Sequence, residues 1–302
     1  MEQIDQLAQI AAQSGCMVCR DEPMSRHTTF KIGGPADLFI KVFTLSAIQQ
    51  LYQAAYERSI PLLVVGNGSN MLVSDSGIRG AVVTLAGEFS EIRLTEDTVI
   101  ECGAGATLAS LCNFAKEHSL TGLEFAWGIP GAAGGAAFMN AGAYGGEMEN
   151  VLTGCTHVSQ KGELGGFKGD ELKLGYRHSV YSETGETILS LTLQLEKGRK
   201  DQIGRAMDEL FQRRKSKQPL ELPSAGSVFK RPQGHFAGTL IEECGLKGAR
   251  VGGAMVSEKH AGFIVNAGGA TCKDVLELIE YIKKTVFERT GVTLECEVKT
   301  FE

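Results

Sequence analysis

Two polar residues in loops of this 302-residue chain could take part in chemistry. Ser227 follows Gly226 in the loop PSAGSVFKRP, which has no adjacent histidine to act as a base. A hydroxyl that donates a proton or a hydrogen bond therefore suits Ser227 better than a hydrolytic nucleophile. Arg177 stands in the sequence Tyr-Arg-His-Ser and could bind a carboxylate through two parallel hydrogen bonds. The simpler interpretations are an ordinary loop serine and a surface arginine.

The C-terminal segment VTLECEVKTF offers a third reactive group. Apolar and polar residues alternate along it, which predicts a strand with Glu295 and Glu297 on the same face. If that face lines a cleft, one of the two glutamates is a candidate acid, and the spacing does not choose between them. A solvated edge of a sheet would give the same pattern.

A glycine-rich stretch at 125–146 contains no charged residue. Its seven glycines, with Pro130 and Asn140, exclude a lipid-exposed helix, because the backbone hydrogen bonds would have no replacement in a bilayer. The composition favours a loop whose N–H groups approach a ligand, with one helical turn over 132–139 whose start points at a phosphate. The alternative is a loop that only packs against a neighbouring helix.

A second glycine-rich segment, Gly66–Asn70, follows a short buried strand. It is interpreted either as a nest of backbone N–H groups around a pyrophosphate or as a plain Asn-Gly hairpin turn. The dinucleotide pattern GxGxxG fails here, since position 71 is methionine, and fails again after Gly103, since position 108 is leucine. The Walker A pattern is absent, because Gly-Lys occurs nowhere.

Charge and cysteine content limit the partners. A net charge of −6 argues against nucleic acid as the main partner, so an anionic ligand must meet a local basic cluster. Two such clusters flank Ser227, and they could equally be a solvated helix end: Arg213, Arg214, Lys215 and Lys217, then Lys230 and Arg231. The eight cysteines are scattered, and Cys16 and Cys19 form a lone CxxC, so we expect no metal site. The acidic N-terminus is unlike a signal peptide, so we expect a cytoplasmic protein that does not enter a membrane.

The elements that must position these residues follow an α+β pattern. Segment 27–42 is predicted as two strands joined by a turn at Gly33–Gly34–Pro35, and 160–175 as an exposed hairpin. Further strands are expected at 71–73, 81–85, 98–102, 151–159 and 188–195. Apolar periodicity predicts helices near the N-terminus, after a capping box at Ser46 and Gln49, after Thr107, over 201–215, and from Thr271 to Gly291.

Eight stretches, in order along the chain, resemble the family of UDP-N-acetylenolpyruvoylglucosamine reductases, the FAD enzymes called MurB. These stretches are Thr29–Asp37, Val64–Asn70, Gly128–Glu147, Tyr176–Ser179, Ser224–Pro232, His235–Gly238, Ser257–Asn266 and Leu294–Val298. Ordered matches over nearly the whole chain are specific, and they outweigh the simpler interpretation of each stretch alone. The resemblance implies an α+β fold with a two-part FAD-binding module of the vanillyl-alcohol oxidase (PCMH) type over 1–65 and 66–198. A substrate-binding α+β domain over 199–302 would follow, with its last strand returning to the active site.

The same resemblance implies the site residues. Arg177, Ser227 and Glu297 match the family's catalytic residues, so the family pattern selects Glu297 over Glu295. Substrate contacts are expected from Tyr176, Lys217, Lys230 and Arg231. FAD contacts are expected from Val65, Gly66, Asn67, Gly68, Ser69, Asn70, Gly103, Ala104, Gly128, Pro130, Gly131, Gly134, Gly135, Asn140 and Gly142.

The reaction implied is reduction of the enolpyruvyl group of UDP-N-acetylglucosamine-enolpyruvate to UDP-N-acetylmuramate, in peptidoglycan precursor synthesis. Hydride would pass from NADPH to FAD and then to the vinyl carbon. Arg177 and Glu297 would stabilise the enolate-like charge, and Ser227 would deliver a proton to the α-carbon. The chain lacks the tyrosine-bearing insertion of some members, and we expect a monomer. The alternatives are an FAD oxidase of another alcohol or sugar, and a flavin-binding module without turnover.

Overall fold

The structure is a computed structural model that describes residues 2–301. Contacts between residues divide it into two compact units. Unit 1 holds the residues up to Arg20, then Leu38–Asn67 and Gly80–Arg213, whereas unit 2 holds Asp21–Asp37, Gly68–Arg79 and the chain from Arg214 onward. The three-part division expected from sequence, with boundaries after 65 and 198, concerns functional parts and stays a prediction.

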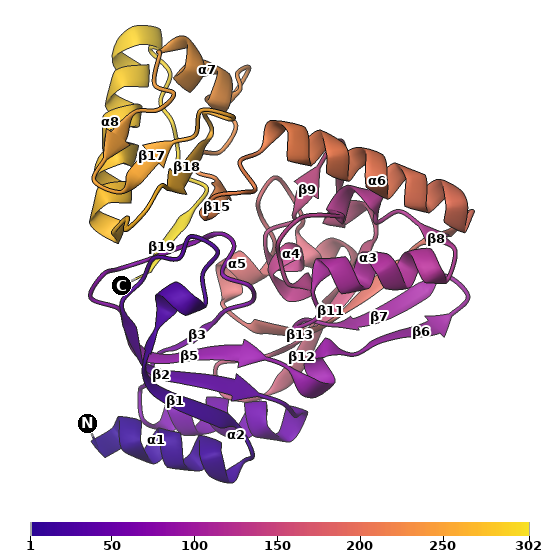
Figure 1. The fold of residues 1–302 in the computed structure, drawn as a ribbon. Helices are drawn as coiled ribbons and strands as arrows, with labels where there is room; N and C mark the ends of the chain where they lie inside the picture. Colours follow the sequence, from indigo (N-terminus) through magenta and orange to yellow (C-terminus); the bar gives the residue numbers. More distant parts are fainter. Residues whose placement is uncertain (1, 302) are drawn as a thin grey trace. The chain divides into compact units, whose positions relative to one another are not determined.

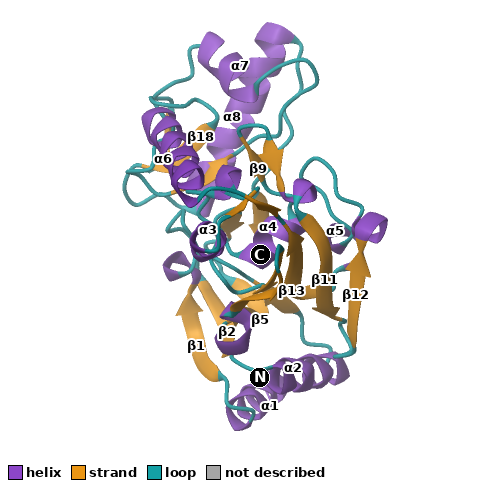
Figure 2. Ribbon diagram, turned by 90° about the vertical axis from the view of Figure 1, so that its right-hand side faces the viewer, coloured by secondary structure: helices purple, strands orange, loops and turns teal. Residues whose placement is uncertain are grey.

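Unit 1 contains a sheet whose strands lie in the order β1-β2-β5-β3. Its strands are β1 (Met17–Pro23), β2 (Pro35–Val42), β3 (Leu62–Val64) and β5 (Ile78–Leu85), and β3 runs parallel to β5. Helices α1 (Glu2–Gln13) and α2 (Leu45–Glu57) lie along one side of this sheet (Figures 1 and 2). Their apolar faces, including Leu7 and Leu51, pack into the same core as Ile40 of β2. The apolar residues recur at helical spacing in these segments because one face of each helix is buried in this core.

A second sheet of unit 1 is antiparallel, in the order β12-β11-β13-β7-β6. Its strands are β6 (Ile92–Glu96), β7 (Val99–Gly103), β11 (Leu152–Val158), β12 (Leu164–Lys168) and β13 (Thr187–Gln194). The helices of this part are α3 (Leu108–Glu117), the short α4 (Ala133–Phe138) and α5 (Tyr181–Thr184). Two-stranded pairs join β9 (Gly142–Ala143) to β10 (Gly146–Glu147) and β8 (Leu120–Thr121) to β14 (Glu196–Lys197). Helix α6 (Lys200–Lys217) follows β14.

A buried histidine lies in this second sheet. His157 of β11 is 7% exposed, its Nδ1 lies 3.2 Å from the hydroxyl of Tyr181, and its ring centroid lies 4.7 Å from that of Phe167. Its Nε2 occupies the place that a Cβ at Gly165 would need, so only glycine fits opposite the ring. Burial lowers the pKa of His157, although the nearby carboxylate of Glu186 acts to raise it.

The lowered pKa of His157 makes stability depend on pH. The unfolded chain binds a proton below about pH 6.5 and the folded chain resists it, so the stabilisation is complete above that pH and is lost as the pH falls through it. We expect the free energy of unfolding in urea to decrease from pH 7 to pH 5, by at most about 1.4 kcal/mol per pH unit for this one proton.

The substitution His157→Gln should reduce that slope. It will not abolish it, since burial also lowers the pKa of His260 in unit 2. Equal slopes for His157→Gln and the unchanged protein, measured by urea unfolding at five pH values, would contradict this assignment.

Unit 2 is built on an antiparallel sheet in the order β15-β18-β17-β16. Its strands are β15 (Ser224–Ser227), β16 (Arg250–Val251), β17 (Ala254–Val256) and β18 (Phe263–Asn266). Helices α7 (Ala237–Glu243) and α8 (Cys272–Thr290) share a core with this sheet through residues such as Ile241 and Ile279. Strand β19 (Lys299–Phe301) pairs in parallel with β4 (Met71–Val73).

Two predicted strands are wrong. Residues 27–34 form turns rather than a strand; Lys31 is left-handed (φ 58°), and Phe30 and Ile32 are buried in the core of unit 2. Residues 292–298 are also irregular apart from an isolated bridge between Cys296 and Phe229, so only the last three residues of the predicted C-terminal strand pair regularly. In both segments the apolar residues are spaced as they are because they are buried in the core of unit 2, and not because the backbone pairs in a sheet.

The predicted capping box at Ser46 is wrong as well, because α2 begins two residues earlier. Thr44 is the N-cap, and its hydroxyl accepts a hydrogen bond from the N–H of Ala47. The caps predicted at Thr107 and Thr271 and the helix end at Gly291 are confirmed. The remaining predicted strands are present within a few residues of their expected limits.

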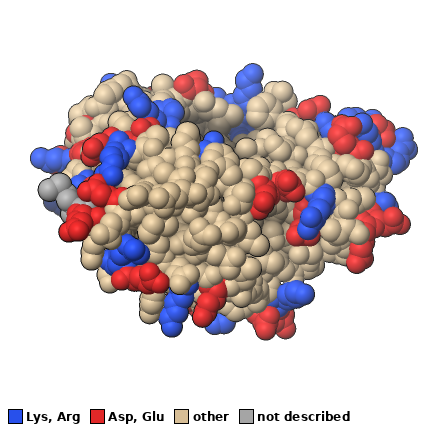
Figure 3. Space-filling view, turned by 90° about the horizontal axis from the view of Figure 1, so that it is seen from below, with Lys and Arg blue, Asp and Glu red and all other residues tan. Residues whose placement is uncertain are grey.

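Charged side chains of both signs are mixed on the face seen in Figure 3. Basic and acidic residues alternate, mostly towards the edge of this view, around a broad area of uncharged residues. The described residues on this face therefore form no continuous basic surface of the kind that nucleic acid requires.

Candidate active site

Ser227 lies at a β-bulge in unit 2. Ser224 pairs with Val265 and Ser227 with Phe263, so three steps on β15 match two on β18. The extra residue is accommodated at Gly226, which is left-handed (φ 76°). A bulge changes the direction of the side chains that follow it, and bulges are common beside active sites. Ser227 is half-buried and stands at the paired end of β15.

Val228, the residue after Ser227, holds the segment that contains Glu297. Its carbonyl accepts hydrogen bonds from the N–H groups of Glu297 (2.7 Å) and Val298 (3.4 Å). The side-chain amide of Asn70 donates to the carbonyl of Glu297 at 3.2 Å. Ser227 and Glu297 are thus brought together within unit 2 by backbone hydrogen bonds, although they are 70 positions apart in the sequence.

The two glutamates that sequence spacing could not separate differ in their surroundings. The side chain of Glu295 is 73% exposed, and its carboxylate lies 3.4 Å from the Nζ of Lys230. Glu297 is half-buried and lies beside the strand that ends at Ser227. This placement favours Glu297 as the reactive carboxylate.

Arg177 belongs to unit 1 and lies in a tight turn. Gly175 and His178 exchange two backbone hydrogen bonds, of 3.2 and 3.0 Å, around Tyr176 and Arg177. Arg177 is left-handed (φ 57°), which is unusual for a residue with a side chain, and its guanidinium carbon lies 5.1 Å from the centroid of the Tyr176 ring. Outliers of this kind concentrate at functional sites.

The glycine-rich segments predicted to bind FAD meet in unit 1. A Cβ at Gly66 would lie 2.8 Å from the Cβ of Ala132, and one at Gly134 would lie 2.7 Å from the Cβ of Ala104. The backbones of Gly66 and Gly134 therefore pack directly against alanine side chains of neighbouring segments. Gly135 is exposed, and the place of its Cβ has no heavy atom within 4 Å. A flat or phosphate-bearing cofactor could approach the backbone there, so these residues fit FAD.

At the start of α4, which was predicted to point at a phosphate, the first two helical N–H groups have partners within the protein. The N–H groups of Ala133 and Gly134 donate to the carbonyls of Ala106 (2.8 Å) and Ala104 (2.9 Å). These first helical donors are therefore used in packing the helix against the loop after β7, and they are not available to a phosphate.

The other predicted FAD residues have mixed surroundings. Gly68 is left-handed and packs so closely on the carbonyl of His27 that no Cβ would fit. Gly128 is also left-handed, and a Cβ at Gly142 would lie 2.8 Å from the Cβ of Glu147. Asn140 is completely buried, and its side chain binds protein groups. The remaining positions predicted to contact FAD are Val65, Asn67, Ser69, Asn70, Gly103, Pro130 and Gly131.

The predicted substrate residues lie on the surface of their units. Lys217 is exposed at the end of α6, and Tyr176 is 54% exposed in the Arg177 turn. The guanidinium carbon of Arg231 lies 4.7 Å from the ring centroid of Phe236, which is 62% exposed. Sequence reasoning missed Phe236 as an individual residue; a phenylalanine at a helix start within the stretch His235–Gly238 was the only signal available.

Gly134 and Gly135 provide a matched pair of substitutions. Gly134→Ala should overpack against Ala104 and lower the stability of the apoprotein by about 1–3 kcal/mol. Gly135→Ala should leave the apoprotein unchanged or slightly more stable, because alanine favours the helix and meets no atom. The same methyl group should weaken FAD binding about 10-fold or more if the cofactor lies against Gly135. Thermal unfolding and titration of flavin fluorescence measure the two effects, and normal FAD affinity in Gly135→Ala would remove Gly135 from the cofactor site.

Two family models match the chain. The model for the FAD binding domain matches residues 36–165, and the model for the C-terminal domain of UDP-N-acetylenolpyruvoylglucosamine reductase matches residues 218–301. Curated relatives match nearly the full length. The UDP-N-acetylenolpyruvoylglucosamine reductase of Alkaliphilus oremlandii is 50% identical over 94% of this chain and 93% of its own length. That of Listeria monocytogenes is 49% identical over 92% and 93%, respectively.

A solved structure agrees with these matches. The crystal structure of UDP-N-acetylenolpyruvylglucosamine reductase (MurB) from Thermus caldophilus superposes with a TM-score of 0.82 and 38% sequence identity. The match covers 95% of this chain and 99% of that one. Together with the FAD-domain model, it confirms the predicted fold class, an FAD-binding module followed by a C-terminal α+β domain.

Proposed function

The chain belongs to the UDP-N-acetylenolpyruvoylglucosamine reductase family, and on that premise we propose that Arg177, Ser227 and Glu297 carry out its reaction. The protein is an FAD-dependent oxidoreductase that reduces UDP-N-acetylglucosamine-enolpyruvate to UDP-N-acetylmuramate with NADPH, in peptidoglycan precursor synthesis. The observation that carries this function is 50% identity to a named reductase over 94% of the chain. The contact between the Ser227 and Glu297 segments supports the residue assignment.

Bound FAD supplies the hydride chemistry of both half-reactions. The task left to the protein is to stabilise negative charge on the enolpyruvyl carboxylate and to protonate the α-carbon. Arg177 can bind the carboxylate with two hydrogen bonds, and Glu297 adds a second polar group at the developing charge. Ser227 donates the proton. Because a free hydroxyl is a weak acid, Ser227 can donate only as the carbanion forms, with water or a neighbouring group restoring its proton.

The residues proposed to bind the UDP-sugar are Tyr176, Lys217, Lys230 and Arg231. Lysine and arginine suit the diphosphate, although Lys230 also forms an exposed ion pair with Glu295 that must weaken when a phosphate binds. Arg231, stacked on Phe236, combines a positive charge with an exposed aromatic ring. This pairing suits a nucleotide better than a simple alcohol.

We further propose that the protein acts in the cytoplasm as a monomer. No helix among residues 2–301 is both long enough and apolar enough to span a membrane. The structure gives the cysteines as thiols and not as disulfides, which suits a reducing compartment. Sedimentation velocity at micromolar concentration tests the monomer, and a concentration-dependent dimer would contradict it.

A single spectroscopic experiment tests the function. The purified protein should be yellow, should bleach with NADPH under anaerobic conditions, and should recover its colour when UDP-N-acetylglucosamine-enolpyruvate is added. Bleaching without recovery would favour a related FAD oxidase of another alcohol or sugar. Tight flavin binding without oxidation of NADPH in the presence of substrate would favour a flavin-binding module without turnover.

A further inference from the structure

The turn that carries Arg177 is held in a strained conformation. Gly175 and His178 form reciprocal backbone hydrogen bonds on either side of the two central residues, Tyr176 and Arg177. Arg177 is left-handed. A left-handed residue with a Cβ is disfavoured, so the turn persists only if its surroundings hold it. The contacts on either side of the turn therefore decide where the guanidinium lies.

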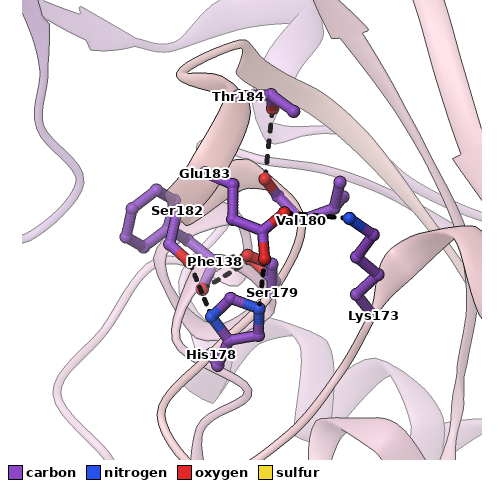
Figure 4. A network of polar contacts seen from close by, with 8 residues as sticks. All are labelled: Phe138, Lys173, His178, Ser179, Val180, Ser182, Glu183 and Thr184. Atoms are coloured by element: carbon purple, nitrogen blue, oxygen red, sulfur yellow. Dashed lines mark hydrogen bonds and ion pairs between the residues drawn. The ribbon is translucent and has the colours of Figure 1, made fainter.

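Hydrogen bonds from two buried side chains flank this turn, one on each side. On the side that follows Arg177, the hydroxyl of Ser179 donates to the carbonyl of Phe138 at 2.7 Å, as Figure 4 shows. On the side that precedes it, the side-chain amide of Asn140 donates to the carbonyl of Gly175 at 3.0 Å. Ser179 and Asn140 are both 0% exposed, whereas Phe138 and Gly175, which carry the acceptors, are half-buried, so the two donors are shielded from water.

Asn140 has its hydrogen-bonding capacity engaged within the protein. Its amide nitrogen also lies 3.2 Å from a carboxylate oxygen of Glu147, and its side-chain oxygen accepts from the N–H of Glu149 at 2.8 Å. Asn140 is itself left-handed (φ 41°), a conformation that asparagine tolerates better than most residues. A direct FAD contact, which sequence resemblance assigned to Asn140, would have to compete with these bonds.

Both hydrogen bonds involve the C-terminal end of helix α4, where Phe138 accepts one and Asn140 donates the other. The other end of α4 packs on the loops that fit FAD. Phe138 is the last residue of α4 and Asn140 follows its C-cap. At the start of α4, Ala133 and Gly134 are hydrogen-bonded to Ala106 and Ala104. The helix therefore connects the loops that fit FAD with the turn that presents Arg177, through hydrogen bonds within unit 1.

We propose that Asn140 and Ser179 are positioning residues for Arg177. They hold the left-handed turn in place relative to the FAD loops, so that the guanidinium meets the substrate carboxylate without rearrangement. The proposal rests on the role given to Arg177 in the proposed function. Neither residue touches substrate; each acts through the backbone of the turn.

The selective readout is the second half-reaction. Ser179→Ala should slow reoxidation of the reduced holoenzyme by UDP-N-acetylglucosamine-enolpyruvate about 10-fold or more, because small errors in orientation are costly to rate. Reduction by NADPH should stay within about 2-fold, since Arg177 has no part in it. Stopped-flow absorbance measures both rates on protein with full FAD occupancy. Asn140→Asp keeps the shape of the side chain and loses the donor to Gly175, but it also places a second carboxylate beside Glu147. In protein that folds and carries full FAD the same selective loss is expected, so this variant serves if Ser179→Ala does not fold.

Thr184→Val is the control, at an exposed position of the same segment. It also removes a hydrogen bond from a hydroxyl to a backbone carbonyl, that of Val180 at 3.2 Å, in the same network but farther along the chain from Arg177 (Figure 4). Both half-reactions should stay within about 2-fold of the unchanged protein. A loss in Thr184→Val equal to that in Ser179→Ala would overturn the proposal, since it would indicate general loosening of the network.

A double-mutant cycle separates positioning from independent effects. In an Arg177→Ala background, Ser179→Ala should cause no further slowing, because the group that it positions is absent. The same factor in both backgrounds would overturn the positioning role, as would equal slowing of both half-reactions. Normal reoxidation by Arg177→Ala alone would overturn the proposed function of Arg177 and the positioning role with it. Slow Arg177→Ala with normal Ser179→Ala and Asn140→Asp would overturn the positioning role alone.

Discussion

Replacing Ser227 with alanine is expected to slow reoxidation of the reduced enzyme by UDP-N-acetylglucosamine-enolpyruvate by about 100-fold or more. This is the usual loss when a general acid is removed. Reduction by NADPH should remain near normal, because no proton is delivered to substrate in that half-reaction. Anaerobic stopped-flow measurement of the two half-reactions on one preparation makes each rate a control for the other.

The substitution Ser227→Ala removes the hydroxyl and leaves the local backbone structure unchanged. Alanine retains the Cβ, the pairing of position 227 with Phe263, and the carbonyl of Val228 that accepts from Glu297, so the hydroxyl alone is lost. Ser224→Ala on the same strand is the matched control. Its carbonyl still accepts the 2.7 Å hydrogen bond from Thr29, so both rates should be unchanged. Rapid reoxidation in Ser227→Ala would show that another group protonates the α-carbon.

Regular elements could be predicted from the sequence because their causes are local. Helix α8 has its cap at Thr271, an apolar stripe that includes Ile279, and a left-handed glycine at its end, and each of these is visible in the sequence. The segments around Phe30 and Leu294 could not be assigned in this way. Their alternating apolar residues fill the core of unit 2 from irregular backbone, and burial produces the same pattern as pairing in a sheet.

In the candidate site, the sequence identifies some residues but does not show what their side chains contact. The glycines of the cofactor loops could be identified because close packing of backbone requires them, as at Gly66 and Gly134. The asparagines in the same loops have protein partners that the sequence does not reveal. The amide of Asn70 donates to the carbonyl of Glu297, and that of Asn140 to the carbonyl of Gly175. Sequence spacing does not reveal where a short amide points, and here the partners are more than 30 positions away.

A comparison of Glu297→Ala with Glu295→Ala should give the second large effect. Glu297→Ala is expected to slow reoxidation by about 10²–10³-fold, the range typical when one group that stabilises developing charge is removed. Its backbone hydrogen bond to Val228 survives the substitution, so the segment stays in place. Glu295→Ala removes only an exposed ion pair with Lys230, which contributes about 0–1 kcal/mol, and reoxidation should stay within about 2-fold.

The pair tests whether burial selects the reactive carboxylate where sequence alternation could not. Both residues lie in one irregular segment held against Phe229, Val228 and Lys230 by backbone hydrogen bonds, so a general disturbance of the segment would affect both variants. A large loss confined to Glu297→Ala therefore assigns the effect to that carboxylate. A larger loss in Glu295→Ala would mean that the exposed ion pair with Lys230 opens when substrate binds and that Glu295 then turns towards the reacting group.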